Sequence, residues 1–308
     1  MRVTLLSGGT GGAKLARGLL DVTGAAGLTV IANTGDDTEI YGVHVSPDPD
    51  LITYWLADAI DERGYGIRGD SWEVMSALEA AGRPVWFRLG DRDLAMCLIR
   101  TELLGAGERL TDAHAAVVRA MGVEARVLPM TDEPVRTRVT ARGRALPFQE
   151  FMVAERAVGP IENVEFAGAE AARPTAEVLA AIATADVIVI GPSNPVVSIG
   201  PILALAGMRE ALAAARAPVV AVSPFVGGAV LKGPTALFCE HAGIELRAGG
   251  LLDAYEGLLD GMVADEPVAG LASLEVDTLM ASPEARRSLA TMTLEFAASL
   301  GRRRPTSG

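Results

Sequence analysis

Cysteine is nearly missing from this chain, since its 308 residues include only Cys97 and Cys239, far apart in the sequence. Two distant cysteines exclude a disulfide framework and a cysteine-rich metal site, so we expect buried thiols in a reducing compartment. Histidine is also scarce, and His44, His114 and His241 are scattered. Their spacing indicates neither a histidine metal site nor a Ser-His-Asp triad.

Long apolar runs are missing too: none reaches the roughly 18 residues that a membrane-spanning helix needs. Met1 leads almost directly into an expected strand rather than into a signal peptide, so we expect a cytoplasmic protein with no membrane partner. Basic residues are outnumbered, with 27 Lys and Arg against 39 Asp and Glu and a formal net charge of −12. That sign opposes binding to nucleic acid, whose phosphates would be repelled.

The stretch from Val3 to Leu20 predicts a buried strand, a glycine-rich turn at Ser7–Gly12 and a helix. Glycines allow successive backbone N–H groups to close around an anion, and the helix that follows adds the positive end of its dipole. The turn therefore suits a phosphate. A first α/β turn that binds nothing is the alternative.

Neither common nucleotide fingerprint fits this turn. In a Walker loop Lys14 falls in register, but Ala13 and Leu15 stand where Gly and a metal-binding Ser or Thr belong. In a dinucleotide fingerprint Lys14 replaces the third Gly, which disfavours a nicotinamide-dependent oxidoreductase. We interpret the turn as an open phosphate loop.

Aspartates gather after the second expected strand, Leu28–Ala32. Ligands collect at the carboxyl ends of parallel strands, so we expect these aspartates to lie beside the glycine-rich turn. Converging carboxylates repel one another unless a cation lies between them, and Mg²⁺ is the simplest candidate. Turn and cap chemistry is the alternative for each residue, and Asp50 suits the N-cap of a helix from about Leu51. The four residues are Asp36, Asp37, Asp48 and Asp50.

The middle of the chain contains residues that suit a helix cap and arginines that suit the binding of an anion. Asp70 and Glu73 have the spacing of a capping box at the start of a helix. A short strand is expected at Trp86–Leu89. Three arginines follow that would suit a phosphate or carboxylate clamp, or ion pairs with nearby aspartates: Arg88, Arg92 and Arg100.

Alternating residues from Val135 to Phe148 predict an antiparallel hairpin, and we expect a small α+β lid insertion at about residues 133–170. Asp186–Ile190 is typical of a buried parallel strand. It runs into Gly191–Pro195, a rigid turn that suits nucleotide binding, or that only redirects the chain.

These patterns predict one α/β domain over residues 1–308, a doubly wound, mostly parallel Rossmann-like sheet. A strand near Ile244–Leu246, a helix from Pro283 to about Leu300 and a disordered tail at 302–308 complete the expectation.

Taken together, the motifs resemble the 2-phospho-L-lactate transferase family, which acts late in the synthesis of the deazaflavin coenzyme F-420. They occur in the family's order and cover most of the chain: SGGTGGAKL at Ser7–Leu15, NTGDD at Asn33–Asp37, SPDPD at Ser46–Asp50, RLGDRD at Arg88–Asp93, PMTDEPV at Pro129–Val135, FQEF at Phe148–Phe151, GPSNPVVSIGPI at Gly191–Ile202 and SPFVGG at Ser223–Gly228. Gly12-Ala13 departs from relatives that carry Pro in this turn.

The resemblance implies a Mg²⁺-dependent homodimer. It would transfer a 2-phospho-L-lactyl or enolpyruvyl phosphate group from a guanosine diphosphate-linked donor to 7,8-didemethyl-8-hydroxy-5-deazariboflavin, with GMP released. The implied donor-binding residues are Ser7, Gly8, Gly9, Thr10, Gly11, Gly12, Lys14, Gly191, Pro192, Ser193, Asn194 and Pro195. Asp37, Asp48 and Asp50 would surround the metal and the acceptor hydroxyl, Asp48 and Asp50 would be catalytic, and Asp50 and Arg88 would contact the deazaflavin. We expect Asp50→Asn to leave the fold intact and to cut turnover roughly tenfold or more.

A non-catalytic nucleotide-sugar-binding regulator of the gluconeogenesis-factor type is the alternative, since it is similar around the glycine-rich turn and Ser193-Asn194-Pro195. The SPDPD and RLGDRD stretches favour the transferase.

Overall fold

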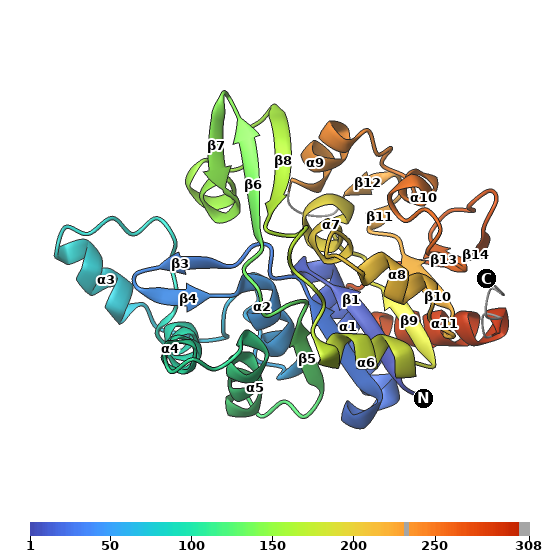
Figure 1. Cartoon of the computed structure of the whole chain (residues 1–308), viewed down its shortest axis with the longest axis horizontal. Helices are drawn as coiled ribbons and strands as arrows, with labels where there is room; N and C mark the ends of the chain where they lie inside the picture. The colour runs from blue at the N-terminus through green and yellow to red at the C-terminus, as the bar shows by residue number, and fades with distance from the viewer. Residues whose placement is uncertain (231–233, 302–308) are drawn as a thin grey trace.

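A computed structural model of the chain describes residues 1–230 and 234–301. Its centre is a seven-stranded sheet in the order β14-β13-β10-β9-β1-β2-β5, and every neighbouring pair is parallel (Figure 1). The expected doubly wound, Rossmann-like α/β fold is therefore confirmed. The strands are β1 Val3–Ser7, β2 Leu28–Ala32, β5 Arg126–Pro129, β9 Val187–Ile190, β10 Val219–Val222, β13 Gly261–Ala264 and β14 Ala272–Glu275.

The strand order reverses beside β1. The chain runs from β1 outward through β2 to β5, and then returns to place β9 on the other side of β1 before continuing to β10, β13 and β14. In register, Val3 pairs with Leu28 on one side and with Val187 on the other. In open α/β sheets ligands bind at such a switch point, outside the carboxyl ends of the strands.

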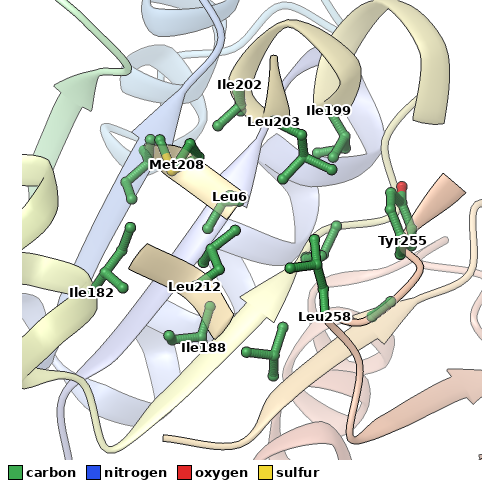
Figure 2. Close-up of a cluster of buried hydrophobic side chains, with 14 of the residues drawn as sticks. Leu6, Ile182, Ile188, Ile199, Ile202, Leu203, Met208, Leu212, Tyr255 and Leu258 are labelled. Atoms are coloured by element: carbon green, nitrogen blue, oxygen red, sulfur yellow. The ribbon is translucent and has the colours of Figure 1, made fainter. Parts of the chain in front are cut away.

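Helices cover both faces because successive residues of each strand point to opposite sides. Leu5 packs in one cluster with Leu15 and Leu19 of the first helix, whereas Leu6 packs in the other cluster with Ile182 and Met208 (Figure 2). Helices of the first layer are α1 Gly9–Thr23, α2 Pro47–Leu56, α5 Leu110–Ala120 and α11 Pro283–Leu300, and those of the second are α6 Ala176–Thr184, α7 Gly200–Leu203, α8 Met208–Ala213 and α10 Leu251–Ala254.

An arm extends from the domain beside α2, at the left of Figure 1. It consists of the hairpin β3 Thr38–Ile40 and β4 Val43–Val45 with α3 Glu73–Ala80 and α4 Asp91–Gly105. A small apolar cluster of its own holds it together, with Met75, Leu89 and Cys97 buried. The arm contributes residues of α4 to the functional site described below, and the adjoining α2 contributes others.

The predicted capping box of Asp70 and Glu73 is wrong. Asp70, which precedes α3, caps α4 instead, and Asp91 of α4 caps α3. Asp70 accepts hydrogen bonds from the backbone of Arg92 and Asp93 at the start of α4. Asp91 in turn accepts from the backbone of Glu73 and Val74 at the start of α3. Sequence spacing finds only local caps, whereas these form between segments about 20 residues apart.

A three-stranded antiparallel sheet, β7-β6-β8, stands outside the central sheet. It contains β6 Arg136–Ala141, β7 Arg144–Pro147, β8 Ile161–Ala167 and a helical turn at Glu150–Ala154, so the predicted hairpin is confirmed. Its role as a lid stays a prediction. The remaining elements are β11 Phe225–Val226, β12 Ala229–Val230, α9 Thr235–Ala242 and the short turns Ala25–Gly27, Pro195–Ile199 and Ala248–Gly250.

Other predictions have mixed outcomes. The helix from Pro283 to Leu300 is confirmed. The strands expected at Trp86–Leu89 and Ile244–Leu246 are wrong, since both segments are irregular, and the sequence interpretation missed β14. The tail at 302–308 lies outside the described residues. Within 1–230 and 234–301, no helix combines the length and apolarity needed to span a membrane.

Candidate functional site

The glycine-rich turn packs directly against the turn that follows β9, at the switch point. The Gly8 amide donates to Ser193 Oγ at 3.3 Å. A methyl group at Gly11 would lie 2.0 Å from the carbonyl oxygen of Pro192, and one at Gly12 would lie 2.2 Å from Ser7 Oγ. The glycines are thus required by the close approach of two loops, one before α1 and one after β9.

A carboxylate from α2 completes this junction. Asp48 Oδ1 accepts a hydrogen bond of 2.6 Å from the amide of Gly9, the first residue of α1, whose φ is +63°. Asp48 Oδ2 accepts one of 2.9 Å from Asn33, which follows β2. The turns after β1, β2 and β9 and the start of α2 therefore meet at one point, where an amide at a helix N-terminus already holds a negative group.

Two predicted donor-binding side chains make other contacts. Asn194 Oδ1 accepts from the backbone of Val196 and Val197, which is cap chemistry, and its amide donates to Thr235 Oγ1 at 3.3 Å. Lys14 Nζ donates to the carbonyl oxygen of Met280 at 3.4 Å. Ser193 contacts the glycine-rich turn, whereas the side chains of Asn194 and Lys14 are held elsewhere.

Asp36 and Asp37 form a buried acidic pair beside this junction. Asp37 Oδ1 accepts from Ser46 Oγ at 2.7 Å, and Asp36 Oδ2 accepts from Gln149 of the antiparallel unit at 3.2 Å. The other oxygen of each carboxylate is buried without a hydrogen bond among the described residues. Burial raises the pKa of Asp37 to about 7, and burial and the charge of Asp48 raise the pKa of Asp36 well above its ordinary value.

Histidine does not neutralise this pair. His44 Nε2 lies 3.5 Å from Asp37 Oδ2, but burial and the nearby Arg100 lower the pKa of His44 to about 4, so its ring is neutral at physiological pH. Two buried carboxylate oxygens without donors are a costly arrangement, and hard oxygen ligands are what Mg²⁺ takes. The unpartnered oxygens of Asp36 and Asp37 are of the chemical type that a divalent cation binds.

Asp50 lies in the first turn of α2 and is not its N-cap, which is Ser46. Its two carboxylate oxygens each accept a 2.7 Å hydrogen bond from Arg100 of α4, whose side chain is fully buried. Arg100 also donates to the carbonyl oxygen of His44. Of the two alternatives, the ion pair holds for Arg100, with Asp50 as its partner. Asp50 stays a predicted ligand-binding residue. Each of its oxygens accepts one hydrogen bond from Arg100 and keeps a lone pair that a ligand could use.

A cavity of about 170 Å³ opens beside Asp48 and Asp50, between α2 and the arm. Its lining includes four aromatic rings, those of Tyr54, Tyr65, Trp72 and Phe87. Arginine side chains stack near Trp72, with the guanidinium carbons of Arg63 and Arg88 at 5.4 and 5.6 Å from its ring centroid. Arg88 lines this cavity and pairs with Glu79 at 2.8 Å, and its contact with an acceptor stays a prediction. Aromatic walls with cationic edges suit a flat, electron-rich ligand.

Tyr54 and Asp93 also line this cavity, and the sequence interpretation assigned them no role. The Tyr54 hydroxyl donates to Asp93 Oδ1 at 2.7 Å. Burial and the charge of Asp50 raise the pKa of Asp93 to about 7. Helical spacing from Asp50 to Tyr54 was the available signal, since residues four apart share one face of a helix.

The acidic cluster predicts a pH effect on stability. The pKa values of Asp37 and Asp93 are raised to about 7 in the folded protein, so their stabilising contribution is present at low pH and is lost as pH rises through that value. The lowered pKa values of His44 and His114 act oppositely, an effect that fades as pH rises past their ordinary pKa of 6.5. From about pH 6.5 to 8 we therefore expect the melting temperature of metal-free protein to fall by at least about 2 °C.

Mg²⁺ should raise the melting temperature more at the upper end of this range, where the carboxylates are ionised. Differential scanning fluorimetry with and without Mg²⁺ measures both effects. Asp37→Asn is the matched variant and should reduce both. A melting temperature that changes neither with pH nor with Mg²⁺ would contradict a cation site here.

Comparisons with known proteins agree with this geometry. The family described as 2-phospho-L-lactate transferase CofD matches residues 3–282. The chain belongs to the 2-phospho-L-lactate transferase family. A phosphoenolpyruvate transferase of Streptomyces griseus is 41% identical over 96% of this chain and 98% of the relative. A 2-phospho-L-lactate transferase of Methanosarcina acetivorans is 37% identical over 93% of this chain and 96% of the relative.

Membership makes the protein a transferase of coenzyme F-420 biosynthesis. Among solved structures, a Bacillus halodurans protein of the UPF0052 family superposes with a TM-score of 0.62 at 17% identity, covering 95% of this chain and 98% of that one. That likeness shows a shared fold alone.

Proposed function

We propose that the transferase moves a phospho-acid group from a guanosine diphosphate-linked donor to the terminal ribityl hydroxyl of 7,8-didemethyl-8-hydroxy-5-deazariboflavin and releases GMP. One observation carries the proposal: Asp48 caps the glycine-rich turn and also lines the aromatic cavity. A phosphate at the turn and a ring in the cavity would therefore meet at the same carboxylate.

The donor would lie at the switch point. Its diphosphate would lie beside the Asp48 carboxylate at the start of α1, with Ser193 alongside. The glycines of Ser7–Gly12 and Gly191–Pro195 add no side-chain bulk around it, and amides at the start of α1 would donate to it. The same amides and the dipole of α1 would bind a diphosphate more strongly than a carboxylate, because a diphosphate carries more negative charge.

In the transfer, the acceptor hydroxyl oxygen forms a bond to the phosphorus of the phospho-acid group, and the bond from that phosphorus to the oxygen of GMP breaks. GMP leaves with the bonding electron pair, and the hydroxyl proton passes to a carboxylate of the site. Such a reaction needs alignment and charge neutralisation more than covalent help from protein.

We propose Mg²⁺ as the cofactor, with the free oxygens of Asp36 and Asp37 as its first ligands and with Asp48 and Asp50 adjoining. When bound, it would neutralise charge on the transferred phosphoryl group. The chain's own groups position the reactants: Arg100 fixes Asp50, and Gln149 fixes Asp36 and connects the antiparallel unit to the site. We propose that this unit covers the bound substrates.

The transferred acid is proposed to be enolpyruvyl phosphate, because relatives named phosphoenolpyruvate transferase reach 41–43% identity. The 2-phospho-L-lactyl group is the second candidate, since a relative of that name is 37% identical. A homodimer stays a prediction that sedimentation measures.

The test is a reaction with each guanosine diphosphate-linked donor and the deazaflavin, followed by mass analysis. We expect equimolar GMP and a phosphodiester product with one donor strongly preferred. The deazaflavin's fluorescence should change on binding, whereas a nucleotide-sugar-binding regulator would cause neither change. Binding of NAD in a thermal-shift assay would instead favour an oxidoreductase. Absence of product with every donor would refute the proposed function.

A further inference from the structure

Asp93 and Tyr54 form a hydrogen-bonded pair in the wall of the aromatic cavity, and no step above uses them. Tyr54 is nearly fully buried, and its hydroxyl donates to Asp93 Oδ1 at 2.7 Å. Both side chains line the cavity together with Asp48 and Asp50. The pair therefore stands where the aromatic walls meet the acidic cluster.

Two helices fix this pair in place. Tyr54 lies one turn after Asp50 on α2, so both face the arm. Asp93 lies in the first turn of α4, where its backbone amide donates to Asp70. Ligand atoms of Asp50, Asp93 and Cys97 lie within 4.8 Å of one another. Asp93 is thus a close neighbour of Asp50 but is held by a different element.

The other carboxylates of the cluster are already engaged. Asp50 gives both oxygens to Arg100, and Asp48 gives its two oxygens to Gly9 and Asn33. The free oxygens of Asp36 and Asp37 fit a cation. Asp93 differs, because within residues 1–230 and 234–301 its side chain accepts only from Tyr54, through Oδ1.

We propose that Asp93, oriented by Tyr54, accepts the hydrogen bond of the acceptor's reacting hydroxyl and aligns its oxygen with the donor phosphorus. The inference rests on the proposed function and deepens it. The acceptor class is a flat heteroaromatic ring carrying a hydroxylated chain: the ring packs on the aromatic walls, and the chain ends at Asp93. Tyr54 is a positioning residue, since it acts through Asp93.

Asp93→Asn and Tyr54→Phe test the pair, since both keep the shape of the side chain. Asp93→Asn should retain deazaflavin binding within about threefold, measured by fluorescence, while single-turnover transfer falls about thirtyfold, because a misaligned nucleophile costs rate rather than ring affinity. Tyr54→Phe should reduce transfer less. The double variant should be no slower than Asp93→Asn alone, since the two residues act as a unit.

Tyr255→Phe is the matched control, because Tyr255 is buried in the cluster on the opposite face of the sheet and does not line the cavity. Its transfer rate should equal that of the unmodified enzyme. Should Asp93→Asn fail to fold, Tyr54→Phe decides: slower transfer with retained binding supports the pair, and unchanged transfer overturns it.

Two further results would also overturn the inference: Asp93→Asn that keeps more than a third of the transfer rate, or one that loses ring binding in the same proportion as transfer. Failure of the unmodified enzyme to transfer at all would instead refute the proposed function.

Discussion

Replacing Arg100 by methionine is expected to lower the free energy of unfolding by about 3–5 kcal/mol, because it leaves the Asp50 carboxylate buried without its partner. Both oxygens of Asp50 are held by this fully buried guanidinium at 2.7 Å. The sequence-based expectation that Asp50→Asn leaves the fold intact is revised for the same reason. That change would leave the guanidinium charge without its counterion. Urea unfolding followed by circular dichroism measures both variants.

Arg2→Met is the surface control, since Arg2 is exposed and its contact with Asp186 is 3.9 Å. It should change the free energy of unfolding by less than about 1 kcal/mol. Combining Arg100→Met with Asp50→Leu should recover part of the loss, because an apolar pair carries no unpaired charge. If Arg100→Met is as stable as the Arg2 variant, Asp50 is not held as described.

Gly11→Ala should reduce donor-dependent turnover by at least about a hundredfold, because the added methyl group pushes apart the turns after β1 and β9, which we propose hold the donor. It would lie 2.0 Å from the Pro192 carbonyl oxygen, a backbone atom that cannot rotate away. The displacement would break the contact between Gly8 and Ser193. Overpacking of this kind also costs about 1–3 kcal/mol of stability. Initial rates at varied donor concentration, with a thermal melt, measure both.

Gly105→Ala is the matched control, since Gly105 ends α4 and a methyl group there meets nothing within 4 Å. It should leave turnover unchanged and stability within about 0.5 kcal/mol. Normal turnover of Gly11→Ala would mean that donor binding does not need the close junction of the loops after β1 and β9.

The central sheet was predictable because its strands are short apolar runs such as Val187–Ile190, each ending in a turn. β14 was not, since its residues are partly exposed at the sheet edge and lack a continuous apolar run. The caps at Asp70 and Asp91 were missed because neither caps its own helix. Asp70 lies before α3 but caps α4, and Asp91 lies at the start of α4 but caps α3. Sequence spacing carries no information about such exchanges.

The candidate site was predictable where it follows strand ends, as at Gly9 after β1 and at Asp36 and Asp37 after β2. It was not predictable where partners come from the arm. Nothing in the spacing of Asp50 and Arg100 indicates that the two meet, and nothing distinguishes Asp93 from an ordinary residue of a helix start. Which carboxylate is paired, capped or open depends on tertiary contacts.

The position of β1 between β2 and β9 has a consequence for synthesis on the ribosome. Val3 pairs with Leu28 early, but its other neighbour is Val187, so one edge of β1 stays bare while the intervening chain is translated. Long-range parallel pairing is slow to form and leaves strand edges exposed. A nascent chain that ends before Ser193 lacks the turn after β9, so the contact between Gly8 and Ser193 that closes the candidate site forms only after that turn is translated.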